Sequence, residues 1–286
     1  MRAECFVPGH ISCIFRPVRG PDTIRTGSLG LGLRLNLGCH ASVEARDDPE
    51  VIIRINGEEC EAPITRMAIG TMGVNGLDID LKHDLPLQQG FGASASGTYA
   101  ATLCVASLFN IDRMVAMTAT HTAECTLGGG LGDLLAIESR AGVPVRAVAG
   151  APMVGSVVDP GLSLDDFSVA IMGGLLSTAS VLGDDDKVIR ITEAGDKAMS
   201  MFLSKPSIDN LFECASMFSQ QVGLESSEVS EAIAKVEGEG HKACMCMLGN
   251  SIYSDLPADE LKRILPNAEV FSCSTYSEPI RVTRTE

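Results

Sequence analysis

The chain lacks several patterns that would place it in a membrane, in a secreted fold or in a zinc fold. It has no run of about 18 apolar residues, which excludes a predicted transmembrane helix. Its N-terminal segment has no apolar signal-peptide core. None of its ten cysteines forms a C-x-x-C pair, and most lie in apolar runs, as buried free thiols do. We therefore predict a cytoplasmic protein without a disulfide or zinc framework.

Basic residues are also scarce. The chain has 22 Lys and Arg against 37 Asp and Glu, a net charge of -15. Nucleic acids and anionic membranes are bound through basic surfaces, so we expect neither as a partner. An acidic protein that binds ATP must instead use local positive elements, namely a metal ion, main-chain N–H groups and a few Arg or Lys side chains.

The length of 286 residues and 45% hydrophobic composition allow a sizeable core, and we expect two domains. Apolar alternation predicts an α+β unit over residues 1–155, followed by a unit over 156–286 in which helices pack on an antiparallel sheet. We predict strands at 3–7, 11–15, 31–44, 51–55, 77–82, 168–172, 242–248 and 270–274. We predict helices at 94–109, 112–126, 133–140, within 192–204, and at 207–222 and 226–237.

The segment 86–101 is typical of a phosphate-binding loop that leads into a helix. Gly90 and Gly92 let main-chain N–H groups approach an anion, and the next helix directs its unpaired N–H groups and positive dipole end to the same point. Hydroxyls at Ser94, Ser96 and Thr98 offer contacts to phosphate or Mg²⁺. The alternative is an ordinary helix N-terminus after a glycine turn.

Two other phosphate loops were compared with this one. A Walker A loop needs Gly-Lys, and that pair is absent from the chain. Gly90 to Ala95 does fit the dinucleotide pattern G-x-G-x-x-A, with Asp112 at a suitable distance. The residues before the loop are polar and include Pro86, whereas a buried parallel strand is required there. The dinucleotide reading is kept as an alternative.

Two acids follow the loop at positions suited to phosphoryl transfer. Glu124 lies on the helix predicted from 112, and Asp133 follows a run of glycines at 128–132 that permits close approach to a ligand. One acid would hold Mg²⁺ and the other would orient or deprotonate the attacking hydroxyl. A helix N-cap for Asp133 and a solvated helical face for Glu124 are the structural alternatives.

Taken together, these motifs resemble the GHMP kinases, the superfamily of galactokinase, homoserine kinase, mevalonate kinase and phosphomevalonate kinase. Segment 86–96 resembles the loop P-x-x-x-G-L-G-S-S-A-A, with departures at Phe91, Ala93 and Ser96. Residues 8–12 resemble the motif P-G-K-x-x-L, with His10 where Lys is usual. Within the superfamily, residues 7–15, the glycine-rich loop 27–32, 121–124 and 130–133 are similar to the archaeal pantoate kinases.

The resemblance implies ATP-dependent phosphorylation of the primary hydroxyl of pantoate, for coenzyme A synthesis. It implies that Ser94 and Glu124 bind Mg²⁺ and that Asp133 orients the hydroxyl. His10 would support the carboxylate of Asp133 as a hydrogen-bond partner. The residues expected to hold the triphosphate are Pro86, Gly90, Phe91, Gly92, Ala93, Ser94, Ala95 and Ser96. An acceptor carboxylate needs a cation and polar contacts, for which the candidates are Ser28, Arg34 and Arg146.

Several points stay open at this stage. Mevalonate, homoserine or shikimate would suit the same loop, because one loop does not define an acceptor. A noncatalytic ligand sensor on the same fold and a nicotinamide-dependent oxidoreductase are the other classes, although a sensor has no need of the two acids. We expect a homodimer, the commonest assembly of soluble proteins.

Overall fold

A long hairpin of two strands forms the centre of the molecule. The computed structural model describes residues 1–174 and 183–285. β1 (Arg2–Val18) pairs with β2 (Gly27–Ala45) along nearly its whole length. The prediction of separate strands at 3–7 and 11–15 was wrong, because β1 continues through Pro8. Register shifts between Pro8 and His10 accommodate the proline, which lacks an N–H to donate to the pairing.

The hairpin is part of an eight-stranded sheet with the order β12-β1-β2-β5-β3-β4, to which β6 is attached through β2 and β7 through β6. Among the strands of this sheet that the structure describes, β3 and β5 pair in parallel and the other pairs are antiparallel. The further strands are β3 (Val51–Ile55), β4 (Glu58–Glu59), β5 (Leu77–His83), β6 (Val145–Val148), β7 (Ser156–Val158) and β12 (Val282–Thr285). Sequence analysis predicted β3 and β5 and missed the four short strands, whose few residues carry too little alternation.

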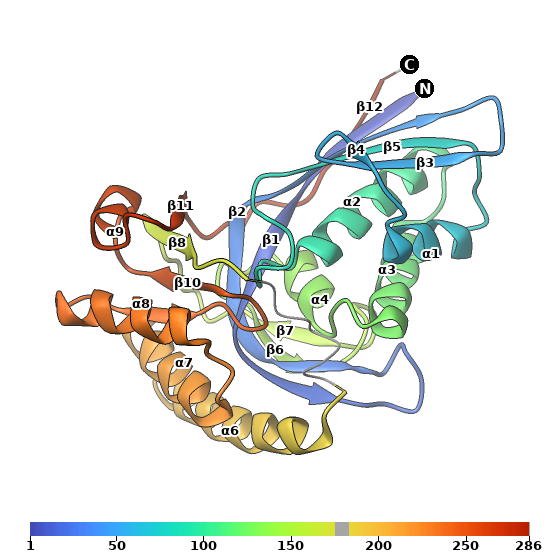
Figure 1. Ribbon diagram of the computed structural model, residues 1–286. Coiled ribbons are helices and arrows are strands. Elements are labelled where there is room, and N and C mark those ends of the chain that lie inside the picture. The colour runs from blue at the N-terminus through green and yellow to red at the C-terminus, as the bar shows by residue number, and fades with distance from the viewer. Residues whose placement is uncertain (175–182, 286) are drawn as a thin grey trace.

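Four helices cover one face of this curved sheet (Figure 1). They are α1 (Pro63–Thr71), α2 (Ala93–Leu108), α3 (Arg113–Leu127) and α4 (Asp133–Glu138). α2 contacts β1, β2, α1 and α3, so it is buried on all sides. Its Ala, Ser, Gly and Thr residues make this possible, because small side chains let neighbouring backbones approach closely. α2, α3 and α4 confirm the predicted helices, whereas α1 was missed.

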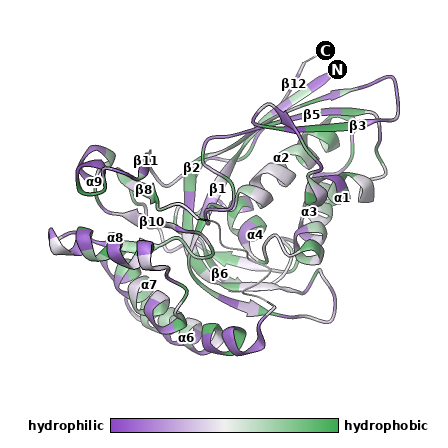
Figure 2. Cartoon of the chain, viewed as in Figure 1, coloured by the Kyte–Doolittle hydropathy of each residue, from purple (hydrophilic) through white to green (hydrophobic). Residues whose placement is uncertain are grey.

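The described residues between 167 and 273 form a second layer of sheet and helices. Its four-stranded antiparallel sheet has the order β11-β8-β10-β9. The strands are β8 (Phe167–Ile171), β9 (Ala243–Met245), β10 (Ser251–Ser254) and β11 (Glu269–Cys273). The helices are α6 (Asp185–Ser204), α7 (Ile208–Val222), α8 (Ser227–Gly238) and α9 (Ala258–Ile264). Figure 2 shows hydrophilic and hydrophobic residues alternating along α6, α7 and α8, as expected of helices with one buried face.

The two layers share the central hairpin. The part of the hairpin formed by the second half of β1 and the first half of β2, which includes Ile14 and Leu33, packs into one core with α6, α7 and α8. The part formed by the first half of β1 and the second half of β2, which includes Val7 and Val43, packs into another core with α2 and β5. β12 returns to pair with β1, so the two termini lie side by side (Figure 1). The α+β class is confirmed, and the boundary near residue 155 stays a prediction.

Two expectations about the whole chain can be compared with the structure. All ten cysteines are free, and eight of them are buried, as their apolar surroundings in the sequence predicted. Among the described residues, no helix combines the length and apolar character that crossing a membrane would require.

Candidate active site

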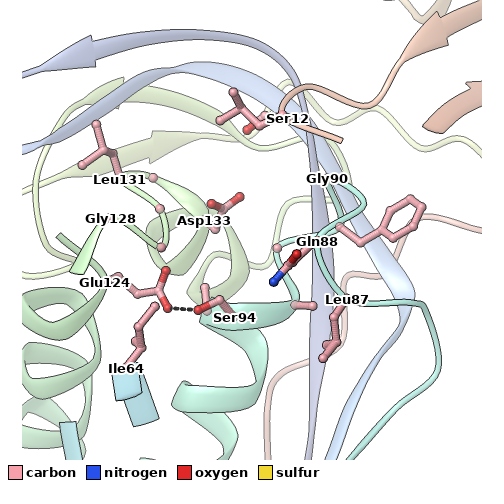
Figure 3. A pocket seen from close by; sticks show the side chains of 18 of the residues that line it. Ser12, Ile64, Leu87, Gln88, Gly90, Ser94, Glu124, Gly128, Leu131 and Asp133 are labelled. Carbon is pink, nitrogen blue, oxygen red and sulfur yellow. Dashed lines mark hydrogen bonds between the residues drawn. The ribbon is translucent and has the colours of Figure 1, made fainter. Parts of the chain in front are cut away.

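A cavity of about 570 Å³ opens where the two layers meet. The segment leading into α2, the end of α3 and the glycine run 128–132 form one side of it. Ser12, Phe15 and Ser28 from the central hairpin and Met247 and Leu248 from the second layer also line it. The predicted phosphate loop and both predicted acids therefore face a single space (Figure 3).

The phosphate loop has the backbone that its glycines predicted. Gly90 has φ 81° and Gly92 has φ 62°, values that L side chains rarely adopt. Gly92 is the N-cap of α2, and no side chain of the described residues caps this helix. The N–H groups of the first turn have no partner inside a helix. They are left, together with the positive end of the dipole, for an anion in the cavity.

The second layer supports this loop from behind. A Cβ on Gly249 would lie 2.1 Å from the carbonyl oxygen of Gln89, so only glycine permits this contact. Ser251 Oγ donates to the same oxygen at 2.6 Å. Sequence analysis gave Gly249 and Ser251 no role in supporting this loop. His10 N–H donates to Phe91 O at 3.0 Å and ties the loop to β1.

Glu124 lies on the inner side of α3 with only 3% of its surface exposed, so the solvated-face alternative is wrong. Ser94 Oγ donates to its Oε1 at 2.5 Å, as the dashed line in Figure 3 marks. Burial raises the pKa of Glu124 to about 8, and the negative charge of Asp133 adds to this effect against the hydrogen bond from Ser94. Its Oε2 has no hydrogen-bond partner among the residues that the structure describes.

The glycine run brings the two carboxylates together. α3 ends at Gly128, which is left-handed with φ 72°. A Cβ on Gly129 would lie 2.4 Å from Glu124 Oε2. A Cβ on Gly130 would lie 2.6 Å from Asp133 Oδ2 and 3.3 Å from Glu124 Oε2. Both free carboxylate oxygens therefore face the space over these glycines, which any side chain would fill.

This donor set fits a magnesium ion that is bound together with phosphate. Mg²⁺ takes oxygen ligands, keeps several waters, and is held by one or two carboxylates plus the phosphates of a substrate. The unpartnered Oε2 of buried Glu124 beside the hydroxyl of Ser94 meets this description. Within residues 1–174 and 183–285, no group of three His, Cys, Asp or Glu side chains is placed to hold a metal without such a substrate.

Asp133 is the first residue of α4, whose N-cap is Gly132, so its carboxylate is free for other contacts. His10 Nδ1 and Asp133 Oδ1 are 2.8 Å apart. Burial raises the pKa of Asp133, but the hydrogen bond from His10 and the positive charge of Arg146 outweigh it, and the net shift is downward. The carboxylate is 23% exposed and lines the cavity. It is thus an ionised group with one oxygen held and one free.

The other predicted site residues fall into two groups. Ser28 lines the cavity with 4% of its surface exposed. His10, Arg146, Pro86 and Ser96 are not among the lining residues in the described part of the chain. His10 and Arg146 lie behind Asp133, and Ser96 Oγ donates within its own helix to Ala93 O at 3.2 Å.

The region 27–32 is also not a loop, because it is the first part of β2.

Arg34 is not brought to the site. Its guanidinium donates to the carbonyl oxygens of Ile137 at 2.8 Å, Tyr276 at 2.6 Å and Glu278 at 2.9 Å. It is completely buried and stacks on the Tyr276 ring. These contacts join β2 to α4 and to the C-terminal segment, so Arg34 has a structural role. Position in the sequence alone could not distinguish it from Arg146.

The cavity lining also includes apolar side chains whose place there was not foreseen. Ile55, Pro63, Ile64 and Leu87 line it, together with His83. Pro63 and Ile64 belong to α1, a helix that sequence analysis did not predict. An apolar wall with one polar ring suits a flat heteroaromatic base. The Pro at the start of α1 was the available signal, since proline is common in the first turn of a helix.

Comparisons with known proteins agree with this geometry. The family model for the GHMP kinases N terminal domain matches residues 62–139. A pantoate kinase of Thermococcus kodakarensis is 30% identical over 301 residues, covering 99% of each chain. A pantoate kinase of Methanocaldococcus jannaschii is 25% identical over 254 residues, covering 87% of this chain and 90% of that one.

Solved structures give the same picture. One described as a phosphotransferase related to the CoA biosynthesis pathway has a TM-score of 0.88 at 25% identity, and the alignment covers 99% of both chains. A mevalonate kinase structure has a TM-score of 0.65 at 12% identity over 97% of this chain and 100% of that one, which indicates a shared fold alone.

Proposed function

The chain belongs to the pantoate kinases of the GHMP kinase superfamily, and on that premise we propose that it phosphorylates the primary hydroxyl of (R)-pantoate with ATP. The product would be 4-phosphopantoate, for coenzyme A synthesis. The observation that carries the proposal is the convergence, on one cavity, of an uncapped helix N-terminus and two carboxylates with free oxygens. Phosphoryl transfer needs these parts, because its catalysis is mainly positioning and charge neutralisation.

The phosphates of ATP would bind at the loop from Gly90 to Ala95, where main-chain N–H groups supply the positive potential that this acidic chain otherwise lacks. The base would lie against the apolar wall that includes Ile64 and Leu87. Ser94 and Glu124 would hold Mg²⁺. The ion supplies neutralisation of the β- and γ-phosphate oxygens when bound.

Asp133 acts on the acceptor hydroxyl. Its Oδ1 is held by His10, so Oδ2 is the atom that accepts the hydroxyl hydrogen bond and receives the proton. Because its pKa is below the ordinary range, Asp133 is a weak base, and its main contribution is to orient the nucleophile. Proton transfer is completed as the hydroxyl becomes acidic on bonding to phosphorus.

Pantoate has a carboxylate, a neighbouring hydroxyl and two methyl groups. Ser28 provides a hydroxyl at the cavity wall, and we propose that it contacts the acceptor. Phe15 and Met247 offer apolar surface in the same cavity for the methyl groups. Arg34 takes no part in this proposal, because its donors are engaged elsewhere. Action in the cytoplasm and assembly as a homodimer complete the proposal, and sedimentation analysis tests the assembly.

The test is release of ADP by the purified protein with Mg²⁺ and ATP, with pantoate, mevalonate, homoserine and shikimate compared in parallel. We expect ADP with pantoate and only background with the other acceptors. Release of ADP with a different acceptor would support the kinase activity and refute pantoate as the acceptor. ATP binding without ADP release for any acceptor would favour a noncatalytic sensor.

A further inference from the structure

Three side chains form a line behind the cavity. Arg146 Nη1 lies 3.2 Å from His10 Nε2, and His10 Nδ1 lies 2.8 Å from Asp133 Oδ1. Arg146 is 1% exposed and His10 is completely buried. Only Asp133 reaches the cavity. A buried cation is therefore connected to the catalytic carboxylate through a single imidazole ring.

The chemistry of the two end groups fixes the proton on the ring. A guanidinium can only donate hydrogen bonds, so His10 Nε2 must accept from Arg146 with its lone pair. The proton is then on Nδ1, which donates to the carboxylate of Asp133. Burial lowers the pKa of His10, more strongly than the hydrogen bond to Asp133 raises it, and the charge of Arg146 lowers it further. The imidazole is thus neutral and held in one tautomer.

Glycines of β2 make the space for this line of side chains. Gly30 pairs directly with Arg146 of β6, and a Cβ there would lie 2.8 Å from Arg146 Nη2. A Cβ on Gly32 would lie 2.4 Å from His10 Nε2. Gly30 and Gly32 thus leave room for Arg146 and His10 as well as for the close β1 carbonyl oxygens of Ile14 and Ile11, whereas a Cβ on Gly27 would meet the backbone of Gly150.

Arg146 is also screened from the cavity. Nη1 is engaged by His10, and Nη2 donates to Ser12 Oγ at 3.3 Å. Its Nε has no partner in the described part of the chain. A Cβ on Gly132 would lie 2.8 Å from this Nε and 2.1 Å from Ser28 Oγ. Gly132 and Ser28 line the cavity next to the guanidinium, whereas Arg146 itself is 1% exposed and is not among the lining residues in the described part of the chain.

We propose that Arg146 is a positioning residue that acts on Asp133 through His10, and that it does not bind the acceptor carboxylate. This inference rests on the proposed function for its kinetic part only. Arg146 fixes the tautomer of His10, since the hydrogen bond at one ring nitrogen determines the proton at the other. His10 then holds Asp133 Oδ1 and leaves Oδ2 directed at the acceptor hydroxyl.

The decisive variant is Arg146→Met, which keeps length and removes the donors. We expect kcat to fall about 100-fold, as for loss of an oriented catalytic group, with the pantoate KM changed by less than about threefold. Adding His10→Lys to this variant places a cation directly against Asp133. It should recover about tenfold in kcat, since charge-assisted contact with the carboxylate is restored. A pantoate KM raised tenfold or more with kcat retained would overturn the proposal, and so would absence of rescue.

The second readout needs no substrate. ¹⁵N NMR of the histidine rings, with His10 assigned by its loss in His10→Asn, should show the neutral Nδ1–H tautomer in the wild type and loss of that tautomer in Arg146→Met. Arg34→Met is the matched control, because Arg34 is also buried but its guanidinium donates to three backbone carbonyl oxygens and stacks on Tyr276, so the tautomer of His10 should be unchanged in it. A wild-type His10 protonated on Nε2, or on both nitrogens, would refute the inference even if Arg146→Met does not fold. Failure of the wild type to phosphorylate pantoate would refute the proposed function and leave this spectrum unaffected.

Discussion

Glu124 and Asp133 face the same space over Gly130, yet their surroundings move their pKa values in opposite directions. Glu124 is buried beside a hydroxyl, and the pKa of its carboxyl rises to about 8. Asp133 has His10 and, behind it, Arg146, which hold its pKa below the ordinary value. The difference supports the proposed roles: with no ligand bound, the lowered pKa of Asp133 favours its ionised form and the raised pKa of Glu124 favours its protonated form.

The difference comes from the elements behind each acid. α3 and the phosphate loop give Glu124 only Ser94 as a hydrogen-bond partner, with Oε2 unpartnered in the described residues. The central hairpin and β6 supply Asp133 with a histidine and an arginine that are both almost fully buried. Under the proposed function, Mg·ATP would complete the side with Glu124, and the side with Asp133 would be preorganised for the acceptor.

Replacing Asp133 should have the largest effect on this comparison. In Asp133→Asn, the amide keeps the shape but cannot take the proton, and we expect kcat to fall by about 10³-fold from lost base and electrostatic contributions. ATP binding, measured by calorimetry, should change by less than about threefold, since Asp133 serves the acceptor side. Turnover of Asp133→Asn near the wild-type rate would remove Asp133 from the mechanism.

Replacing Ser94 should have the next largest effect, and on the other side of the cavity. Ser94→Ala removes the hydroxyl beside Glu124 Oε1 and one proposed ligand of Mg²⁺. We expect kcat/KM for Mg·ATP to fall by about 10²-fold, with the pantoate KM unchanged. Thr98→Val is a control on the same helix, because Thr98 is buried against Thr65 and does not line the cavity in the described residues. An equal loss in both variants would show that Ser94 has no specific role.

The pH dependence of stability tests the raised pKa of Glu124 and should give the smallest effect. Because the folded pKa of about 8 lies above the ordinary glutamate value of 4.5, folding favours the protonated form. This stabilisation is fully present below the unfolded pKa and is lost as the pH rises through the folded pKa. Between pH 6 and pH 9, the ligand-free wild type should lose about 2 kcal/mol more unfolding free energy than Glu124→Gln, measured by urea denaturation. Parallel curves for the two proteins would contradict the raised pKa.

The sequence predicted the phosphate loop and both acids because local chemistry determines them. Gly90 and Gly92 have the positive φ that their type suggested, and α2 begins within one residue of the predicted start. The glycines at 128–132 indicated close approach, and the structure places Glu124 and Asp133 against them. These features depend on a few neighbouring residues, so a linear pattern is sufficient to find them.

Features that depend on cross-strand neighbours could not be predicted in this way. The run 27–32 was expected to be a loop, but Gly30 and Gly32 are strand residues that leave space for Arg146 and His10 from other strands. The sequence alone does not distinguish the roles of Arg34 and Arg146. The tertiary structure shows that Arg34 binds backbone carbonyls and that Arg146 binds a histidine. α1 and the apolar wall were missed because that helix has only nine residues.

The most direct measurement of the central claim is the position of the new phosphate in the product. Wild-type protein would be incubated with Mg·ATP and (R)-pantoate, and the product would be examined by ³¹P–¹H correlation NMR. The proposed function predicts that phosphorus couples to the CH₂ protons beside the primary hydroxyl. Coupling to the CH proton beside the carboxylate, or ADP formed without any phosphorylated pantoate, would contradict it.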